Sequence, residues 1–232
     1  MYTDQLVEVI RYLKEQFPSI VRITSYARSR TVTHKTPEEL TRLKQVGLSR
    51  LHIGLETGDD ELLKLVDKGA TSVDHIEAGQ KALAAGFQLS EYVMPGLGGR
   101  KLSEQHALNT ARVLNEINPN FIRMRPFIPS SRTPLLEAYR KGEFELNSPH
   151  ELLREIRLLI ENLEVTSGVC FDHSLNPSYR SDSGTVHLLK QDYDGYKFPG
   201  EKKTVLDLID KGLQIDESIF IDVRDAVGTD RL

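Results

Sequence analysis

A carboxylate and a cation twelve residues apart are the strongest chemical signal in this sequence. Glu56 ends the apolar run LHIGLE at residues 51–56, and Lys68 closes the helical pattern that follows Asp59. The run predicts a buried strand, and α/β folds bind ligands at the carboxyl ends of such strands. A carboxylate there can accept hydrogen bonds from the hydroxyl groups of a ligand. A lysine folded back over the strand end can bind the carboxylate of a ligand. The alternative is that Glu56 caps the next helix while Lys68 favours the helix dipole.

Two arginines alternate with apolar residues in the run FIRMR at residues 121–125. Alternation places Arg123 and Arg125 on one face of a strand. If that face is the interior of the fold, each unpaired guanidinium would cost several kcal/mol, on the order of the penalty for any buried charge. We therefore expect an anionic ligand or acidic partners such as Glu56 and Glu91. A strand edge that faces solvent is the alternative.

A third polar cluster follows the apolar run at residues 168–171. Asp172, His173 and Asn176 could close the site and contact a substrate. A histidine beside an aspartate can transfer protons or bind a metal, but neighbours on a strand face opposite ways and need not cooperate.

The other histidines give no metal-ligand spacing, and no metal held by this chain is expected. His52 lies in a predicted strand and is expected to be packed. Five others are scattered and expected at the surface: His34, His75, His106, His150 and His187.

Four predicted strands must position these side chains, and they begin near residues 21, 51, 88 and 121 with a helix in every interval. This repeat predicts a parallel sheet. Helices are expected over about 6–16, 36–46, 103–117, 134–141, 148–162 and 203–213, with a short one after Asp59. A further helical pattern runs through Ile76, Ala82 and Leu83 and is ended by Gly86. A fifth strand is possible at 168–171, whereas 172–200 loses periodicity and is expected to be a structured loop or a mobile tail. We divide the chain into a barrel domain at 1–165 and an extension at 166–232.

Three segments in this order resemble the radical S-adenosylmethionine (SAM) enzymes, in the branch of the elongator-type and coproporphyrinogen-oxidase-type proteins. They are HIGLETGDDELLKLVDKGAT at 52–71, EYVMPGLGG at 91–99 and FIRMRPFIPSSRTPL at 121–135. The resemblance covers about residues 20–165. It implies an α/β fold, a partial (β/α) TIM-like barrel in which the visible strands are the third to sixth of six.

The resemblance also implies that SAM binds at the carboxyl ends of the strands. Glu56 matches the position that contacts the ribose or methionine part, and Lys68 the position that takes the methionine carboxylate. Met94 and Gly96 match a strand end beside the adenine, although an isolated PGLGG would be read as a turn that needs glycine. Tyr92 stands where some relatives carry a ribose-binding acid, and Glu91 could substitute only if the register shifts.

Two further cofactor contacts are expected on the first and fourth visible strands. Tyr26, with Ser25 and Arg28, follows the first visible strand where relatives place a polar residue near the methionine amino group. Arg125 is expected in the same site, and Arg123 nearer the substrate.

This sequence lacks the cysteine motif that binds the iron–sulfur cluster in the family. Radical chemistry requires a CxxxCxxC loop whose thiolates hold a [4Fe–4S] cluster, and this chain has one cysteine, Cys170. We expect an N-terminally truncated domain that is inactive alone, with a missing segment or a second copy covering the open sheet edge.

Composition is that of an ordinary globular protein, with 39% hydrophobic and 28% charged residues and a net charge of −4. No apolar run could span a bilayer and no signal peptide is evident, so we expect a cytoplasmic protein without membrane partners. A non-redox module that binds SAM or a nucleoside, or a protein partner, is the main alternative function. A barrel hydrolase or aldolase is a weaker one.

Overall fold

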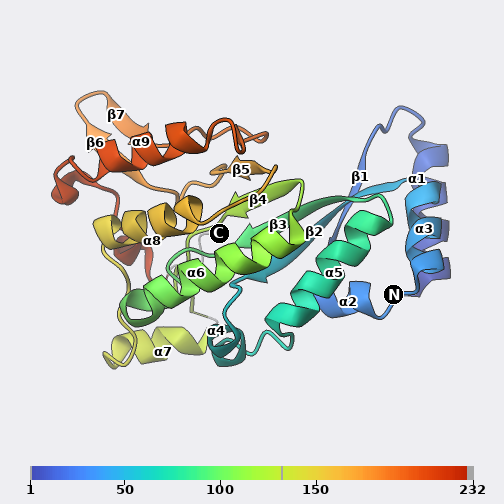
Figure 1. Cartoon of the computed structure of the whole chain (residues 1–232), viewed down its shortest axis with the longest axis horizontal. Helices are drawn as coiled ribbons and strands as arrows, with labels where there is room; N and C mark the ends of the chain where they lie inside the picture. The colour runs from blue at the N-terminus through green and yellow to red at the C-terminus, as the bar shows by residue number, and fades with distance from the viewer. Residues whose placement is uncertain (1, 132, 229–232) are drawn as a thin grey trace.

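A six-stranded sheet forms the centre of the computed structural model, which describes residues 2–131 and 133–228 (Figure 1). The strand order is β1-β2-β3-β4-β5-β8; the first five are parallel, and β8 is antiparallel to β5. The strands are β1 Ile23–Ala27, β2 Leu48–Glu56, β3 Gln88–Val93, β4 Phe121–Met124, β5 Gly168–Cys170 and β8 Tyr196–Lys197. A separate hairpin pairs β6 (Ser178–Ser181) with β7 (Gly184–His187).

Helices occupy every interval between the parallel strands. They are α1 Thr3–Gln16, α2 Ser29–Thr33, α3 Pro37–Val46, α4 Asp60–Leu65, α5 Ser72–Ala84, α6 Gly99–Ile117, α7 Pro134–Arg140, α8 Pro149–Glu161 and α9 Lys202–Gly212, with 3₁₀ turns at Glu217–Ile219 and Val223–Ala226. Local sequence explains their starts: Thr36, Thr71 and Ser148 each form a capping box at the N-terminus of α3, α5 and α8.

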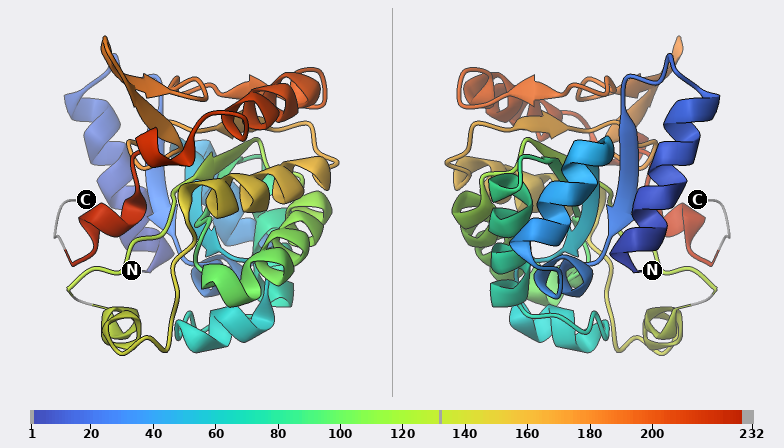
Figure 2. Two further views of the ribbon diagram at one scale, coloured as in Figure 1. Left: turned by 90° about the vertical axis from the view of Figure 1, so that its left-hand side faces the viewer. Right: turned by 90° about the vertical axis from the view of Figure 1, so that its right-hand side faces the viewer.

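The main core lies between one face of the sheet and α5, α6 and α8, which cover that face in Figure 1. Strand residues Leu51, Ile53 and Leu89 pack there with helix residues such as Ala82 and Ile156, all of them buried. The β1 edge is flanked by α1 and α3, which are seen on either side of β1 in the right panel of Figure 2. The face opposite the main core is the inside of the partial barrel, and we call it the concave face.

A smaller apolar cluster lies beyond the carboxyl ends of the strands. Leu97, Phe127 and Leu146 form its centre, and Met94 and Val66 pack against it. It ties α4 and α7 to the loops that follow β3 and β4.

The predicted partial (β/α) barrel is confirmed: the described strands form an open, mostly parallel sheet. Residues 172–200 form the β6–β7 hairpin and β8, so this stretch is a structured segment. The short α2 was not predicted, because five residues give too little periodicity to recognise. No helix among the described residues is long and apolar enough to cross a membrane.

Candidate functional site

The concave face carries several of the residues that the sequence singled out. Strand register places Tyr26 beside His52, Gly54 beside Tyr92, and Tyr92 beside Arg123. Arg123 in turn pairs with Cys170 of β5. These residues occupy two adjacent rows of the register, and together they form a polar and aromatic surface opposite the apolar face that the helices cover.

The end of β2 is strained where it delivers Glu56. The backbone φ of Glu56 is 61°, in the left-handed region that non-glycine residues avoid. The Thr57 N–H donates to the Leu55 carbonyl over 2.8 Å, closing a γ-turn around Glu56. The register with β3 also shifts between Gly54 and Glu56. The turn and the shift together direct the Glu56 side chain back over the strand.

Glu56 and Lys68 meet above Gly54. The Lys68 Nζ donates to Glu56 Oε1 over 2.7 Å, and each side chain keeps 24% of its surface exposed. A Cβ on Gly54 would lie 2.2 Å from Glu56 Oε1 and 3.1 Å from Lys68 Nζ, so the ion pair fills the space that a side chain there would need. The alternative role for Glu56 is wrong, because Asp59 is the residue that caps α4, by accepting from the Leu62 N–H.

A cavity of about 430 Å³ adjoins Lys68 at the end of β1. Its lining includes three cations and one carboxylate: Arg28, Arg30, Lys68 and Asp67. Lysine has three N–H donors, and Glu56 takes one of those on Lys68. A ligand carboxylate therefore fits beside Lys68 without breaking its ion pair.

Gly96, in the loop after β3, is required by its backbone conformation. Gly96 has a φ of 85°, and its N–H already donates to Glu155 over 2.6 Å. A Cβ there would meet Leu152 at an ordinary 3.4 Å, so the dihedral angle requires glycine and a close approach does not. Met94 is partly buried against the smaller apolar cluster.

A buried polar network joins the ends of β2 and β3, and sequence reasoning missed it. His106 on α6 contacts the Thr57 hydroxyl through Nδ1 at 2.7 Å and the Met94 carbonyl through Nε2 at 3.1 Å. Glu155 on α8 lies 3.6 Å from His106 Nε2, and burial raises the pKa of its carboxyl group. A charged residue among the apolar positions of α8 was the available signal.

Two surface assignments are therefore wrong. His106 and His75 are both buried, because they lie on helix faces that pack against neighbouring elements. Burial lowers the pKa of His75 to about 4, so it is neutral at ordinary pH.

Three rings are in contact on the concave face. The centroid of His52 lies 5.2 Å from that of Tyr26 and 5.4 Å from that of Tyr92, and the tyrosine centroids are 6.0 Å apart. The two tyrosine hydroxyls are 3.4 Å apart. Burial, with Arg123 and Arg50 next in effect, lowers the pKa of His52 to about 4. The imidazole is therefore neutral at ordinary pH.

Asp172 is the acidic partner of both strand arginines. It accepts from Arg123 over 2.6 Å and from Arg125 over 3.0 Å. Glu56 and Glu91 were expected in this role, and that expectation is wrong because Glu56 pairs with Lys68 and Glu91 points elsewhere. Tyr193 closes the deeper end of the face, with its ring centroid 3.8 Å from the Arg123 guanidinium carbon.

Glu91 faces the helices rather than the concave side. It pairs in register with Ile53 and Ile122, is fully buried, and neither carboxyl oxygen has a hydrogen-bond partner. Burial, aided by the charge of Glu56, raises its pKa well above the ordinary value. No register shift brings it to a ribose position.

The remaining substrate candidates, Asp172, His173 and Asn176, have different hydrogen-bond partners. Asn176 is buried and donates to the Met124 carbonyl over 3.2 Å, while the Nδ1 of half-buried His173 accepts from the Leu175 N–H. Burial lowers the pKa of His173, with Arg125 next in effect. Asp172 contacts the arginines, and His173 shares no hydrogen bond with it among the contacts of the described residues.

The residues present do not fit a [4Fe–4S] cluster. Cys170 is the sole cysteine, it is buried on β5, and burial raises the pKa of its thiol to about 11. Within residues 2–131 and 133–228, no group of three or more histidine, cysteine or acidic side chains could hold a metal ion.

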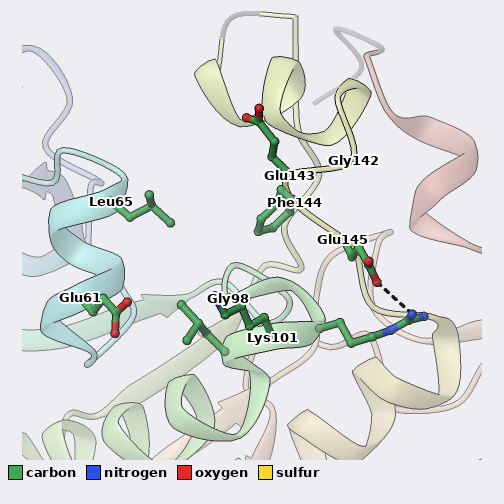
Figure 3. Close-up of a pocket in the computed structure, with 10 residues that line it drawn as sticks. Glu61, Leu65, Gly98, Lys101, Gly142, Glu143, Phe144 and Glu145 are labelled. Atoms are coloured by element: carbon green, nitrogen blue, oxygen red, sulfur yellow. Dashed lines mark hydrogen bonds and ion pairs between the residues drawn. The ribbon is translucent and has the colours of Figure 1, made fainter.

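A further cavity of about 490 Å³ lies outside the concave face (Figure 3). Glu61 and Leu65 on α4 approach it from one side, and Phe144 and Glu145 from the α7–α8 loop. It contains none of the predicted site residues and mixes charges of both signs, so it is not the candidate site.

Comparisons with known proteins agree with this arrangement. A family model for the radical SAM superfamily matches residues 1–111. The matched stretch, 111 of the 232 residues, is similar to the radical SAM superfamily. A tRNA uridine(34) acetyltransferase from Methanocaldococcus infernus is 25% identical over 120 residues, which are 51% of this chain and 22% of that protein.

Two solved structures share the fold. The archaeal Methanocaldococcus infernus Elp3 matches with a TM-score of 0.56 and 19% identity, over 83% of this chain and 42% of the other. Coproporphyrinogen III oxidase (HemN) from Escherichia coli matches with a TM-score of 0.54 and 18% identity, over 84% and 46%. These similarities support the elongator-type and coproporphyrinogen-oxidase-type branch, and the chain spans less than half the length of each of these three proteins.

Proposed function

We propose that this chain is the SAM-binding portion of a radical SAM catalytic domain. The observation that carries the proposal is the Glu56–Lys68 pair, held above Gly54 at the carboxyl end of β2 and bordered by a cationic cavity. Arginine and lysine side chains around one cavity bind a carboxylate by charge-assisted hydrogen bonds. Lys68 and Arg28 would take the methionine carboxylate, and Glu56 would accept from the ribose hydroxyls or the amino group.

The loop after β3 would contact the adenine. Met94 offers a partly buried apolar side chain next to Glu56, whose carbonyl accepts from the Met94 N–H over 2.9 Å. The His106–Glu155 network fixes Met94 and Gly96 from behind, so the loop is already ordered before a ligand binds. Tyr26 and Arg125 are further cofactor candidates, and Arg123, Asp172, His173 and Asn176 remain substrate candidates.

SAM supplies radical chemistry only when a [4Fe–4S] cluster reduces it. Three thiolates cannot come from these 232 residues, so no cleavage step is assigned to this chain. We infer that the chain by itself binds the cofactor without activating it, and that activity requires a cluster held outside this sequence.

The test is isothermal titration of the 232-residue chain with S-adenosylhomocysteine and SAM in iron-free buffer. We expect saturable binding, and we expect Lys68→Met to weaken it about tenfold or more, a loss of about 1.4 kcal/mol. Lys64→Met is the matched control, because Lys64 is exposed on α4 and should leave the affinity unchanged. Absence of binding by the wild-type chain at about 1 mM ligand, a free energy of only about −4 kcal/mol, would contradict the proposal.

A non-redox nucleoside-binding module is the second candidate. The single thiol, buried and with a raised pKa, favours it because no reactive cysteine is available. The test is to measure the affinity for S-adenosylhomocysteine with and without an added protein segment that carries a [4Fe–4S] cluster. A micromolar affinity that this segment does not change would favour the module over the radical enzyme.

A further inference from the structure

We propose that the concave face binds a planar aromatic ring that carries an anionic group, next to the cofactor position. This names the substrate class of the site proposed above and therefore rests on that function. This class of ligand is indicated by three rings in contact and by the arginines beside them. The position next to the cofactor is indicated by Gly54, which lies beside Tyr92.

The rings offer an open aromatic surface. Tyr26 is 76% exposed although it touches both His52 and Tyr92. Tyrosine rings in contact usually bury most of their surface, whereas here the outermost ring is left open at the lip of the face. A flat ligand ring would stack on Tyr26 and remove that surface from water.

His52 adds a polar group without a partner. It is 5% exposed and lies in register beside Tyr26, so it belongs to the floor of the same face. Its buried Nδ1 has no hydrogen-bond partner, although buried ring nitrogens are normally satisfied. A neutral imidazole can accept from, or donate to, a heteroatom of a ligand ring.

The charge of the face is positive. The guanidinium groups of Arg22, Arg50, Arg123 and Arg125 all act on His52, and Asp172 is the carboxylate that pairs with two of them. Arg50 is buried and is bonded to the neutral groups of Gln88 and Tyr193. An anion on the ligand would balance the positive charge of the arginines that Asp172 does not neutralise.

Arg125 is placed to meet that anion. Its guanidinium carbon lies 5.0 Å from the Tyr92 ring centroid, and 22% of its side chain is exposed. Among the described residues both of its hydrogen bonds use Nη1, so a ligand placed here would meet the Nε and Nη2 donors. A ring stacked on Tyr26 and Tyr92 therefore brings a substituent within reach of Arg125.

The same ring would lie against the proposed cofactor. Tyr92 pairs in register with Gly54, the residue beneath the Glu56–Lys68 pair. The substrate ring and the cofactor would then share one boundary at Gly54 and Tyr92.

The test separates ring from charge with three small probes. Benzoate has both features, benzamide has the ring without the charge, and cyclohexanecarboxylate has the charge without the flat ring. Binding is followed by chemical shifts of the tyrosine rings in NMR titrations of the full chain. We expect benzoate to bind about fivefold or more tightly than either other probe, because both the stacking and the ionic contact are needed. Phenyl phosphate then shows whether phosphate replaces carboxylate.

Variants locate the probe. Tyr26→Leu and Arg125→Gln should each weaken benzoate binding about fivefold or more, while Tyr12→Leu and Arg140→Gln, at exposed positions elsewhere, should not. S-adenosylhomocysteine is titrated into the same variants, and benzoate is titrated into Lys68→Met, whose benzoate affinity should stay within about twofold, below 0.5 kcal/mol. This arm keeps the two proposals distinguishable, since benzoate can bind even if the cofactor does not.

Three results would overturn the inference. Equal affinity for the three probes would remove the need for a ring with a charge. Equal effects of the control variants would place the probe elsewhere. Loss of S-adenosylhomocysteine binding in Tyr26→Leu with benzoate unaffected would assign Tyr26 to the cofactor instead.

Discussion

Glu56 combines a candidate ligand contact with an unfavourable backbone conformation. Its φ of 61° brings Cβ close to the following carbonyl oxygen, which costs a non-glycine residue roughly 1–2 kcal/mol. Such strain persists where the surrounding structure imposes it, and here a γ-turn, a register shift and the ion pair to Lys68 do so. The strained backbone at Glu56 therefore lowers the stability of the fold but orients the Glu56 carboxylate toward the site.

Replacing Glu56 in two ways tests for this strain. Glu56→Gly and Glu56→Ala both remove the carboxylate and its ion pair, but only glycine adopts a positive φ without strain. We expect the glycine variant to be about 1 kcal/mol more stable than the alanine variant in urea unfolding. An alanine variant as stable as the glycine variant would show that the turn relaxes and stores no strain.

At the residue scale, the sequence could predict Glu56 with Lys68 but not Arg123 with Asp172. A short helix folds Lys68 back onto the strand that carries Glu56, so local sequence is sufficient. The pairing of Arg123 with Asp172 depends on β5 lying beside β4, and strand order is not encoded in either segment. For the same reason the His106 and Glu155 network, which joins α6, α8 and two loops, was missed.

At the scale of the element, strand β3 is buried on both faces over most of its length. Its sequence QLSEYV alternates, but both faces hold polar residues, so periodicity alone could not assign Glu91 or Tyr92 to a face. Register decides: Tyr92 joins the concave face, and Glu91 joins the core with no hydrogen-bond partner. An unpaired carboxyl group there opposes folding when it ionises.

Glu91 should make stability depend on pH. Because the folded-state pKa is raised above 4.5, the native state holds this proton more tightly than the unfolded chain does. Stability is therefore highest below about pH 4.5 for this group and falls as pH rises toward the folded-state pKa. We expect Glu91→Leu to be more stable than wild type at pH 8, by about 1–3 kcal/mol as for an unsatisfied buried group, and this difference to shrink toward pH 4.5.

The matched control is Glu116→Leu, because Glu116 is exposed on α6. Urea unfolding of the three proteins between pH 4.5 and 8 separates the Glu91 contribution from that of His52 and His75, which all three share. A difference between Glu91→Leu and wild type that does not change with pH would mean that Glu91 keeps one protonation state in that range.

For the whole molecule, the C-terminal part is built into the same core as the barrel. β5 and β8 complete the central sheet, and Val205 and Ile209 of α9 are buried in the cluster that contains Ile53 and Leu153. The division at residue 165 followed the loss of periodicity after Asp172, and periodicity reports local elements but not which core they join. The described residues share one continuous apolar core across that boundary.

Ile209→Ala tests whether this shared core unfolds as a unit. The side chain is fully buried, so its truncation should cost about 2–5 kcal/mol, and in a cooperative fold that loss is felt by every element. We expect urea transitions followed by circular dichroism and by amide exchange of β2 to shift together, whereas Lys211→Ala, on the exposed side of α9, shifts neither. An early transition confined to residues after 165, with β2 protection unchanged, would support the predicted two-domain division. A joint shift would mean that the aromatic and arginine-lined face, which β4 and β5 build across the boundary, exists only when both parts are folded.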